Sequence, residues 1–243
     1  MQSWGLTDPG CVRTQNQDTF AMEQLDRNTL LCIVCDGMGG AKSGNIASSL
    51  AVDVFVQEVR RTWTALMSQE KINLMLHSAA KLANFTVFDQ AQQFEEFDGM
   101  GTTLVAILLH NRHATVAHVG DSRAYRINSD GIWQITRDHS LVQMMVERGE
   151  LTREMARTYP GRNFITRAIG TEPIVACDVS NMELGRGEFL LLCSDGLSNV
   201  LDDQEILFEV VHGVNRTDCC QRLIDIAKNR GAPDNVTAVL MMV

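Results

Sequence analysis

The sequence predicts an α+β fold in which antiparallel sheets are covered by helices. Short apolar runs follow one another with only a turn between them, which indicates antiparallel strands rather than βαβ crossovers. Two long segments in the first half and two shorter ones near the end carry apolar residues at helical spacing instead. Strands and helices that are grouped in this way pack as separate layers around apolar cores.

The first third of the chain is expected to contain three strands followed by two long helices. We place the strands at residues 4–8, 19–22 and 30–36, where apolar runs are bounded by turns or polar loops. We place the helices at residues 46–60 and 69–93, where apolar side chains recur every three to four positions. The strand at 30–36 ends at an aspartate that is followed by several glycines, so we expect a sharp turn there.

The middle of the chain is expected to form three closely spaced strands and two short helices. The strands are placed at residues 101–110, 113–119 and 122–127, and the helices at 140–148 and 152–158. Two turn residues separate the first strand from the second, which is too short for a crossover and implies an antiparallel meander.

The last third is expected to alternate between strands and helices. The expected elements are strands at 174–184, 188–194 and 236–243, and helices at 203–212 and 217–229. Thr217 is the expected N-cap of the last helix, because a threonine side chain can accept a hydrogen bond from a free backbone N–H of the first turn.

The composition limits the class of protein. A chain of 243 residues that is 45% hydrophobic can bury a large core, and no Pro-, Ser- or Gly-rich linker divides it, so we expect a single domain over residues 1–243. The net charge of −9 argues against a nucleic-acid partner. The N-terminus shows no signal-peptide pattern, and the longest apolar stretch, 103–109, is too short to span a bilayer. We therefore expect a cytoplasmic protein with no membrane span.

Five of the seven cysteines are scattered through strand-like runs, and Cys219-Cys220 lies in an expected helix, which fits reduced thiols in a cytoplasmic protein. Cys32 and Cys35 form a C-x-x-C pattern that leaves a zinc or dithiol site open. Residues three apart in a strand point to opposite faces, however, so packing is the favoured interpretation.

Several aspartates stand at the ends of apolar runs that are far apart in the sequence. They are Asp36, Asp121, Asp195 and Asp234. An unpaired buried carboxylate costs on the order of several kcal/mol, so convergence on a shared cation is the economical explanation. Carboxylate and carbonyl oxygens suit Mg²⁺ or Mn²⁺ rather than Zn²⁺. For any one of these stretches alone, a strand, a tight turn and a helix start explains the pattern equally well.

Eight short motifs occur in a fixed order along the chain. They are Arg13-x-x-Asn16-x-Asp18, Asp36-Gly37-Met38-Gly39, Gly101-Thr102-Thr103, Gly120-Asp121-Ser122, Asp138-His139-Ser140, Thr166-Arg167-Ala168-Ile169-Gly170, Ser194-Asp195-Gly196 and Asp234-Asn235. This ordered set resembles the metal-dependent protein phosphatases of type 2C, in particular the compact bacterial branch that opposes eukaryotic-like kinases. The resemblance covers essentially the whole chain.

The resemblance implies a four-layer α-β-β-α sandwich, with two antiparallel sheets and helices on both outer faces. It implies one catalytic domain over residues 1–243 with a mobile flap at about residues 140–170, which we call the flap segment. The implied activity is hydrolysis of phosphoserine and phosphothreonine in proteins by a metal-activated water at a dinuclear Mn or Mg centre. The implied partners are phosphoproteins and a cognate Ser/Thr protein kinase, and the protein is expected to be a monomer.

The same resemblance implies the metal ligands. Asp36 matches the carboxylate that bridges two ions, and the Gly37 carbonyl adds a ligand. Asp195 and Asp234 match the residues that complete the shell of one ion, and Asp18 lies near the second ion and acts through water. The resemblance also implies that Asp36, Asp195 and Asp234 take part in catalysis through the ions they hold.

Outside this set, Asp121 matches a carboxylate that shares a third, weaker ion with Asp195. Arg13 matches the arginine that binds the substrate phosphate; the competing interpretation is a surface arginine paired with Asp8 or Asp18. Met38 stands where relatives from higher organisms often carry a histidine proposed as the general acid, so the general acid is left open.

The Asp138-His139-Ser140 motif is expected to have a structural role, and two other functions of the whole protein remain open. His139 is expected to be a buried structural histidine rather than a catalytic one, and Asp138 is a candidate helix cap. A catalytically weak type 2C domain that acts as a binding module would lack a metal carboxylate, and none is missing here. A narrow regulatory substrate, such as an anti-sigma-factor antagonist, is the second alternative; the residues from 139 to 170 resemble the flap of the kinase-opposing branch instead.

Overall fold

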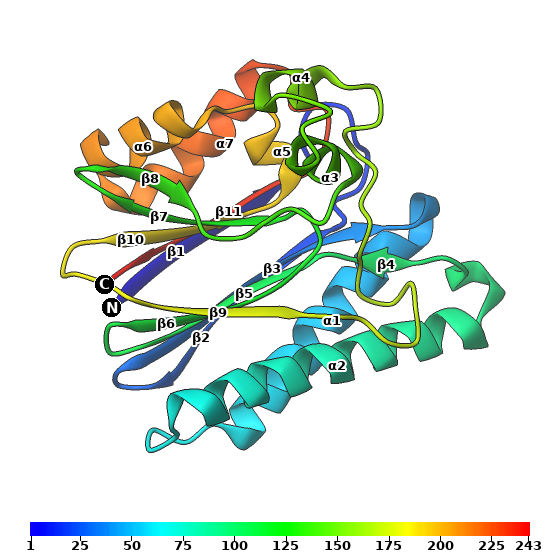
Figure 1. Ribbon diagram of the computed structural model, residues 1–243, viewed down its shortest axis with the longest axis horizontal. Helices are drawn as coiled ribbons and strands as arrows, with labels where there is room; N and C mark the ends of the chain where they lie inside the picture. Colours follow the sequence, from blue (N-terminus) through cyan, green and yellow to red (C-terminus); the bar gives the residue numbers. More distant parts are fainter.

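The computed structural model spans residues 1–243 and describes all of them apart from the side chains of residues 40–42 and 157. Two antiparallel sheets lie face to face, and helices cover both of their outer surfaces (Figure 1). The expected four-layer sandwich is therefore confirmed.

Sheet A has five strands in the order β1-β11-β10-β7-β8, all antiparallel. These strands are β1 (Gln2–Asp8), β7 (Arg123–Asn128), β8 (Gly131–Gln134), β10 (Phe189–Cys193) and β11 (Val236–Met242). The first and last strands of the chain are neighbours, so the two termini lie close together (Figure 1).

Sheet B has the strand order β2-β3-β5-β6-β9, and the short β4 pairs with the end of β3. These strands are β2 (Asp18–Asp26), β3 (Thr29–Met38), β4 (Gly101–Thr102), β5 (Leu104–His110), β6 (His113–Val119) and β9 (Asp178–Glu183). In the β2–β3 ladder, Asp18 lies directly opposite Asp36. The pairing of these two strands alone therefore brings together two carboxylates from separate motifs.

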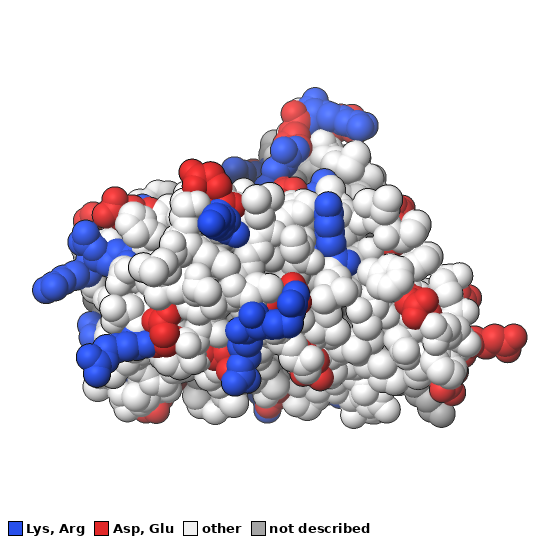
Figure 2. All heavy atoms as spheres, turned by 90° about the horizontal axis from the view of Figure 1, so that it is seen from below, with Lys and Arg blue, Asp and Glu red and all other residues white. Residues whose placement is uncertain are grey.

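Helices α1 and α2 cover sheet B, whereas α5, α6 and α7 lie against sheet A (Figure 1). Their bounds are α1 (Gly40–Thr62), α2 (Gln69–Gln93), α5 (Asp195–Ser198), α6 (Asp203–His212) and α7 (Cys219–Asn229). The flap segment holds α3 (Leu141–Glu147) and α4 (Arg153–Thr158), and two 3-10 turns, η1 (Glu95–Phe97) and η2 (Arg216–Asp218), complete the chain. Figure 2 shows the face over α1 and α2, where charged side chains of both signs are scattered among wide uncharged areas.

Three apolar layers hold the sandwich together, and β3 contributes to two of them. Ile33 and Cys35 point toward α1 and α2, whereas Cys32 and Val34 point between the two sheets. Burial on both faces explains why this strand reads as an unbroken apolar run. Cys32 and Cys35 therefore face opposite layers as expected, and burial raises the pKa of both thiols. The zinc or dithiol interpretation of this pair is wrong.

Several element boundaries differ from the sequence-based prediction. Strand β3 does not turn at Asp36 but continues to Met38. The strand expected at 174–184 begins only at Asp178. Thr217 is not an N-cap, because it lies inside η2 and its N–H donates to the Asn215 side chain at 3.3 Å. Strand β8 and the short helix α5 were not predicted. Among the helices of the described chain, none has the length and apolar character needed to cross a bilayer.

Candidate metal centre

A cavity of about 600 Å³ opens at one end of the sandwich, where strands of both sheets end. Its lining includes Asp36 near the end of β3, Asp121 after β6, Asp195 after β10 and Asp234 before β11. The structure thus brings together the four strand-end aspartates that the sequence singled out. The lining also includes Arg13, Gly37 and Met38, and Asn163 and Ile165 from the flap segment.

Asp36 is held by backbone and hydroxyl contacts that leave its carboxylate for the cavity. Its N–H donates to Thr103 Oγ1 at 2.9 Å, and its C=O accepts from the Thr103 N–H at 2.9 Å. Its C=O also accepts from Thr102 Oγ1 at 2.9 Å. The two threonines of the Gly101-Thr102-Thr103 motif therefore fix the backbone at Asp36.

The glycine after each of two aspartates is required by a close approach of backbone rather than by a turn. A Cβ on Gly196 would lie 1.9 Å from the Asn235 carbonyl oxygen. A Cβ on Gly37 would lie 2.0 Å from the Gly44 carbonyl oxygen. Only glycine allows these approaches. The first of them seats α5 against the loop before β11, which brings Asp195 and Asp234 to the same cavity.

Asp18 lies behind the cavity as a buried carboxylate with one oxygen satisfied. Its Oδ2 accepts hydrogen bonds from Ser194 Oγ at 2.7 Å and from Thr237 Oγ1 at 2.6 Å. Its Oδ1 is buried and has no hydrogen-bond partner among the described residues. Sequence reasoning missed the roles of Ser194 and Thr237, although each stands next to or near a predicted ligand motif. The hydrogen bond to Asp18 explains the presence of the Ser194 hydroxyl, so no nucleophilic role is needed for it.

The carboxylates around the cavity resist ionisation. Burial is the largest cause, and it raises the pKa of Asp195 to about 6, of Asp18 to about 7 and of Asp121 to about 8. Burial also raises the pKa of Asp36 well above its usual range. The neighbouring carboxylates raise these pKa values further, because like charges that are close together disfavour ionisation.

This chemistry fits divalent cations with oxygen ligands. A cation would offset the mutual repulsion of the carboxylates and could engage the orphaned Asp18 Oδ1, directly or through water. Within the described part of the chain, no three acidic, histidine or cysteine side chains form a ready-made ligand cage. Asp234 instead accepts from Arg13, and Asp18 from two hydroxyls, so carbonyl oxygens and water would have to complete any ion's shell.

Arg13 stands at the mouth of the cavity and is 54% exposed at its side chain. Its guanidinium donates to Asp234 Oδ2 at 2.8 Å. The competing interpretation, a pair with Asp8 or Asp18, is wrong, because Arg13 pairs with Asp234 and Asp8 pairs with Lys228 at 2.7 Å. The basic side chain of the first polar loop therefore faces the acidic cluster.

The Asp138-His139-Ser140 motif packs beside the cavity. Asp138 is not a helix cap, because it pairs with Arg123 at 2.6 Å while Ser140 caps α3. His139 is 8% exposed and both of its ring nitrogens have hydrogen-bond partners, so it is buried and hydrogen-bonded as expected.

Comparisons with known proteins agree with this arrangement. A family model described as Protein phosphatase 2C matches residues 12–222. The serine/threonine phosphatase stp of Listeria monocytogenes is 35% identical over 237 residues, which cover 97% of this chain and 93% of the relative. The crystal structure of serine/threonine phosphatase Stp1 from Staphylococcus aureus superposes with a TM-score of 0.93 at 37% identity, covering 100% of this chain and 94% of that one.

A further solved structure carries metal. It is the catalytic domain of the serine threonine protein phosphatase PstP in complex with 2 manganese ions, with a TM-score of 0.85 at 30% identity, and it covers 98% of this chain and 96% of that one. The family model and these relatives span nearly the entire sequence. The chain therefore belongs to the protein phosphatase 2C family of metal-dependent serine/threonine phosphatases.

Proposed function

We propose that this protein hydrolyses phosphoserine and phosphothreonine in proteins at a dinuclear Mn²⁺ or Mg²⁺ centre, in opposition to a Ser/Thr protein kinase. The observation that carries the proposal is the gathering of aspartates from both sheets around one cavity, with Arg13 at its mouth. The acidic lining would repel a phosphate unless cations neutralise it. Binding of a phosphate substrate at this cavity therefore requires bound divalent ions.

The proposed ligands follow the positions of the side chains around the cavity. Asp36 would be shared by the two ions, and the Gly37 carbonyl would add a further ligand. Asp195 and Asp234 would complete one shell, and Asp18 would act through water, because its Oδ1 is buried without a hydrogen-bond partner and the residue is not among those that line the cavity.

A third, weaker ion is assigned to Asp121 together with Asp195. Both line the cavity, and Asp121 lies in a turn rather than in a strand. Ions bound at this centre would supply positive charge to the phosphoryl group and lower the pKa of a water molecule toward neutrality.

Arg13 can change partner when a substrate arrives. Its pair with Asp234 is exposed, and such pairs contribute about 0–1 kcal/mol. A phosphate group offers the guanidinium two acceptor oxygens in a bidentate geometry. Arg13 could then bind the phosphate, and Asp234 would be available to hold an ion.

The chain's own side chains exclude a covalent route through the most obvious nucleophiles. Ser194 donates its hydroxyl hydrogen to Asp18, and burial raises the pKa of the Cys193 thiol to about 12. Met38 at the cavity wall has no proton to give, so a group other than this side chain must protonate the leaving group.

We further infer that the 243 residues act as one catalytic domain, as a cytoplasmic monomer, on phosphoprotein substrates. The flap segment is proposed to be mobile and to help select substrates. Support comes from Asn163 and Ile165, which place this segment in the wall of the cavity.

A phosphopeptide assay tests the proposal. The protein should release phosphate from phosphoserine and phosphothreonine peptides with Mn²⁺ present and lose this activity after chelation and dialysis. Asp195→Asn should abolish turnover, whereas Asp53→Asn, a matched change at an exposed position of α1, should leave it unchanged. Full turnover after chelation would exclude the two-metal proposal.

A further inference from the structure

The turn that carries Asp121 is held in place by His139 rather than by strand pairing. Residues 120–122 lie between the end of β6 and the start of β7. The Gly120 N–H donates to His139 Nδ1 at 2.9 Å, and the His139 N–H donates back to the Gly120 C=O at 2.8 Å. Both backbone groups of the residue before Asp121 are therefore bound by one histidine.

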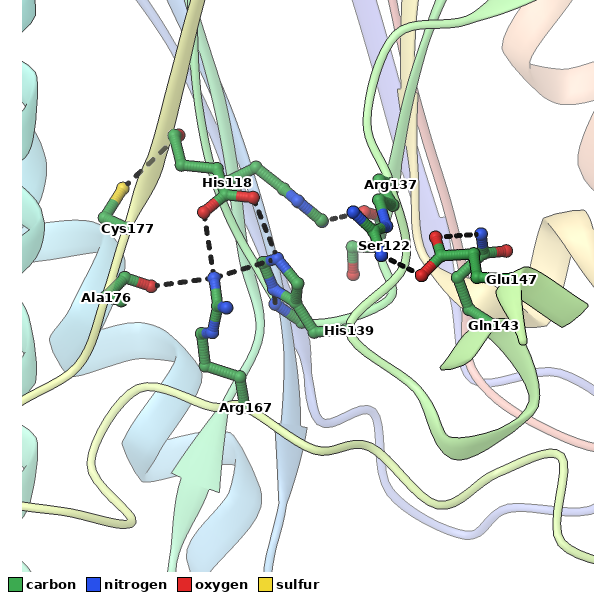
Figure 3. Close-up of polar contacts among 11 residues, drawn as sticks. His118, Ser122, Arg137, His139, Gln143, Glu147, Arg167, Ala176 and Cys177 are labelled. Atoms are coloured by element: carbon green, nitrogen blue, oxygen red, sulfur yellow. Dashed lines mark hydrogen bonds and ion pairs between the residues drawn. The ribbon is translucent and has the colours of Figure 1, made fainter. Parts of the chain in front are cut away.

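A second histidine holds the residue that follows Asp121. His118 Nε2 lies 2.9 Å from the Ser122 carbonyl oxygen (Figure 3). Ser122 Oγ also forms a hydrogen bond with Thr103 Oγ1 at 2.6 Å, and Thr103 Oγ1 accepts a hydrogen bond from the Asp36 N–H. The turn is thus connected to the backbone of Asp36 as well.

The two histidine rings stack on each other, with centroids 4.7 Å apart and planes inclined by 29°. Their hydrogen bonds fix both tautomers, because a backbone N–H can only donate and a carbonyl can only accept. His139 must present a bare Nδ1 to Gly120, and His118 must present Nε2–H to Ser122. Burial lowers the pKa of both rings, that of His118 to about 4, which keeps the stacked pair neutral.

His139 is in turn braced on its far side. Its Nε2 lies 3.1 Å from Asp178 Oδ2 and 3.0 Å from Arg167 Nη1, and Arg167 also donates to Asp178 Oδ1 at 2.9 Å. Because Nδ1 is bare, Nε2 carries the hydrogen and donates it to Asp178. Figure 3 shows Arg167 beside the His139 ring. The His139 carbonyl accepts from the Thr166 N–H at 2.7 Å. His139 therefore contacts both the C-terminal part of the flap segment, through Thr166, and the start of β9, through Asp178.

Glycine is required at the centre of this arrangement. Gly120 has φ +110°, and a Cβ at this position would lie 2.7 Å from the Thr103 side chain. The backbone before Asp121 is consequently in a conformation that neither neighbouring strand imposes. The hydrogen bonds to His139 are what fix it.

We propose that His118 and His139 are positioning residues that grip Gly120 and Ser122 and thereby aim the Asp121 carboxylate into the cavity. This inference rests on the proposed function, because the proposed function assigns Asp121 as a ligand of the weak third ion. Residues that orient metal ligands from behind typically change metal affinity or activity by about 10- to 100-fold when they are replaced.

Four substitutions test the pair in a crossed design. An asparagine Oδ1 stands near the place of a histidine Nδ1, and a glutamine Nε2 stands near the place of a histidine Nε2. His139→Asn and His118→Gln should therefore keep the bonds to the turn. His139→Gln and His118→Asn should lose them. Each class contains one asparagine and one glutamine, so side-chain volume alone cannot produce the expected pattern.

The matched variants should retain near-native dependence of the rate on Mn²⁺. The crossed variants should need about 10- to 100-fold more Mn²⁺ for full activity, while calorimetry shows unchanged tight binding. Hydrogen exchange at the Gly120 amide, measured by NMR on the metal-free protein, should be slow in His139→Asn and fast in His139→Gln. Thermal unfolding confirms that each variant is folded.

Equal behaviour of matched and crossed variants would overturn the positioning role, as would loss of tight Mn²⁺ binding in the crossed pair. The exchange measurement also separates the two proposals. If the native protein showed no metal-dependent activity, the proposed function would fail, yet exchange at Gly120 would still decide whether His139 holds the turn. Slow exchange in His139→Gln would refute the grip whatever the enzyme's activity.

Discussion

Replacing Arg13 by alanine separates phosphate binding from metal binding. In the structure the guanidinium bonds Asp234, and the side chains are 54% and 36% exposed. An exposed ion pair of this kind contributes about 0.2–1 kcal/mol. Its removal frees Asp234, so the affinity for Mn²⁺ should stay constant or rise by no more than about fivefold.

The effect on phosphate should be much larger. A hydrogen bond to a charged group contributes about 1.5–3 kcal/mol, and each 1.36 kcal/mol corresponds to a factor of ten. Arg13→Ala should therefore raise KM for a small aryl phosphate by roughly 10- to 150-fold. Arg13→Lys should recover part of this, because lysine keeps the charge but loses the bidentate fork.

The assay combines steady-state kinetics on an aryl phosphate at saturating Mn²⁺ with calorimetry of Mn²⁺ binding. Arg60→Ala is the matched control, because Arg60 is exposed on α1 and its pair with Glu23 is long, at 3.5 Å. An unchanged KM in Arg13→Ala would refute the assignment to phosphate. A tenfold loss of Mn²⁺ affinity would instead show that Arg13 serves to hold Asp234 in place.

The remaining predictions concern the carboxylates and the flap segment. Asp36→Asn and Asp234→Asn should each abolish turnover while circular dichroism shows an intact fold, and residual metal-dependent activity in either would contradict its role. Asp36→Asn should also raise the melting temperature of the metal-free protein, because it removes one member of a repelling cluster. Changes within residues 158–163 should alter rates on phosphoproteins more than on an aryl phosphate, and equal losses on both would remove a role in selection. Finally, Mn²⁺ should raise the melting temperature more at pH 8 than at pH 6.

The residue pattern was sufficient to predict antiparallel sheets covered by helices and the principal carboxylates, whereas the four-layer order came from the family resemblance. A continuous apolar run such as that of β3 indicates a strand that is buried on both faces. A charged side chain at the end of such a strand needs a partner of opposite charge or hydrogen-bond donors. Asp36 and Asp195 could therefore be identified from local pattern. The structure places both of them, with Asp121 and Asp234, at one cavity.

The parts that escaped prediction depend on contacts between distant segments. The Asp18 carboxylate is held by Ser194 and Thr237, which are 176 and 219 residues away. The need for glycine at 196 comes from a neighbouring carbonyl in another loop, and nothing in the local pattern distinguishes this from a turn. The helix α5 has four residues and no apolar period to reveal it.

The pH dependence of the metal effect follows from the raised carboxyl pKa values. Folded Asp195, Asp18 and Asp121 have pKa values of about 6, 7 and 8, whereas an unfolded aspartate has a pKa of about 3.9. Between these values the folded state holds more protons, so the contribution of these three carboxyls to metal-free stability is full below about pH 4 and is lost as the pH rises toward 8. Cations bind the ionised carboxylates and should oppose this loss. Thermal unfolding at pH 6, 7 and 8, with and without Mn²⁺, should thus show a gap that widens with pH, and a constant gap would show that these carboxylates do not bind the ions.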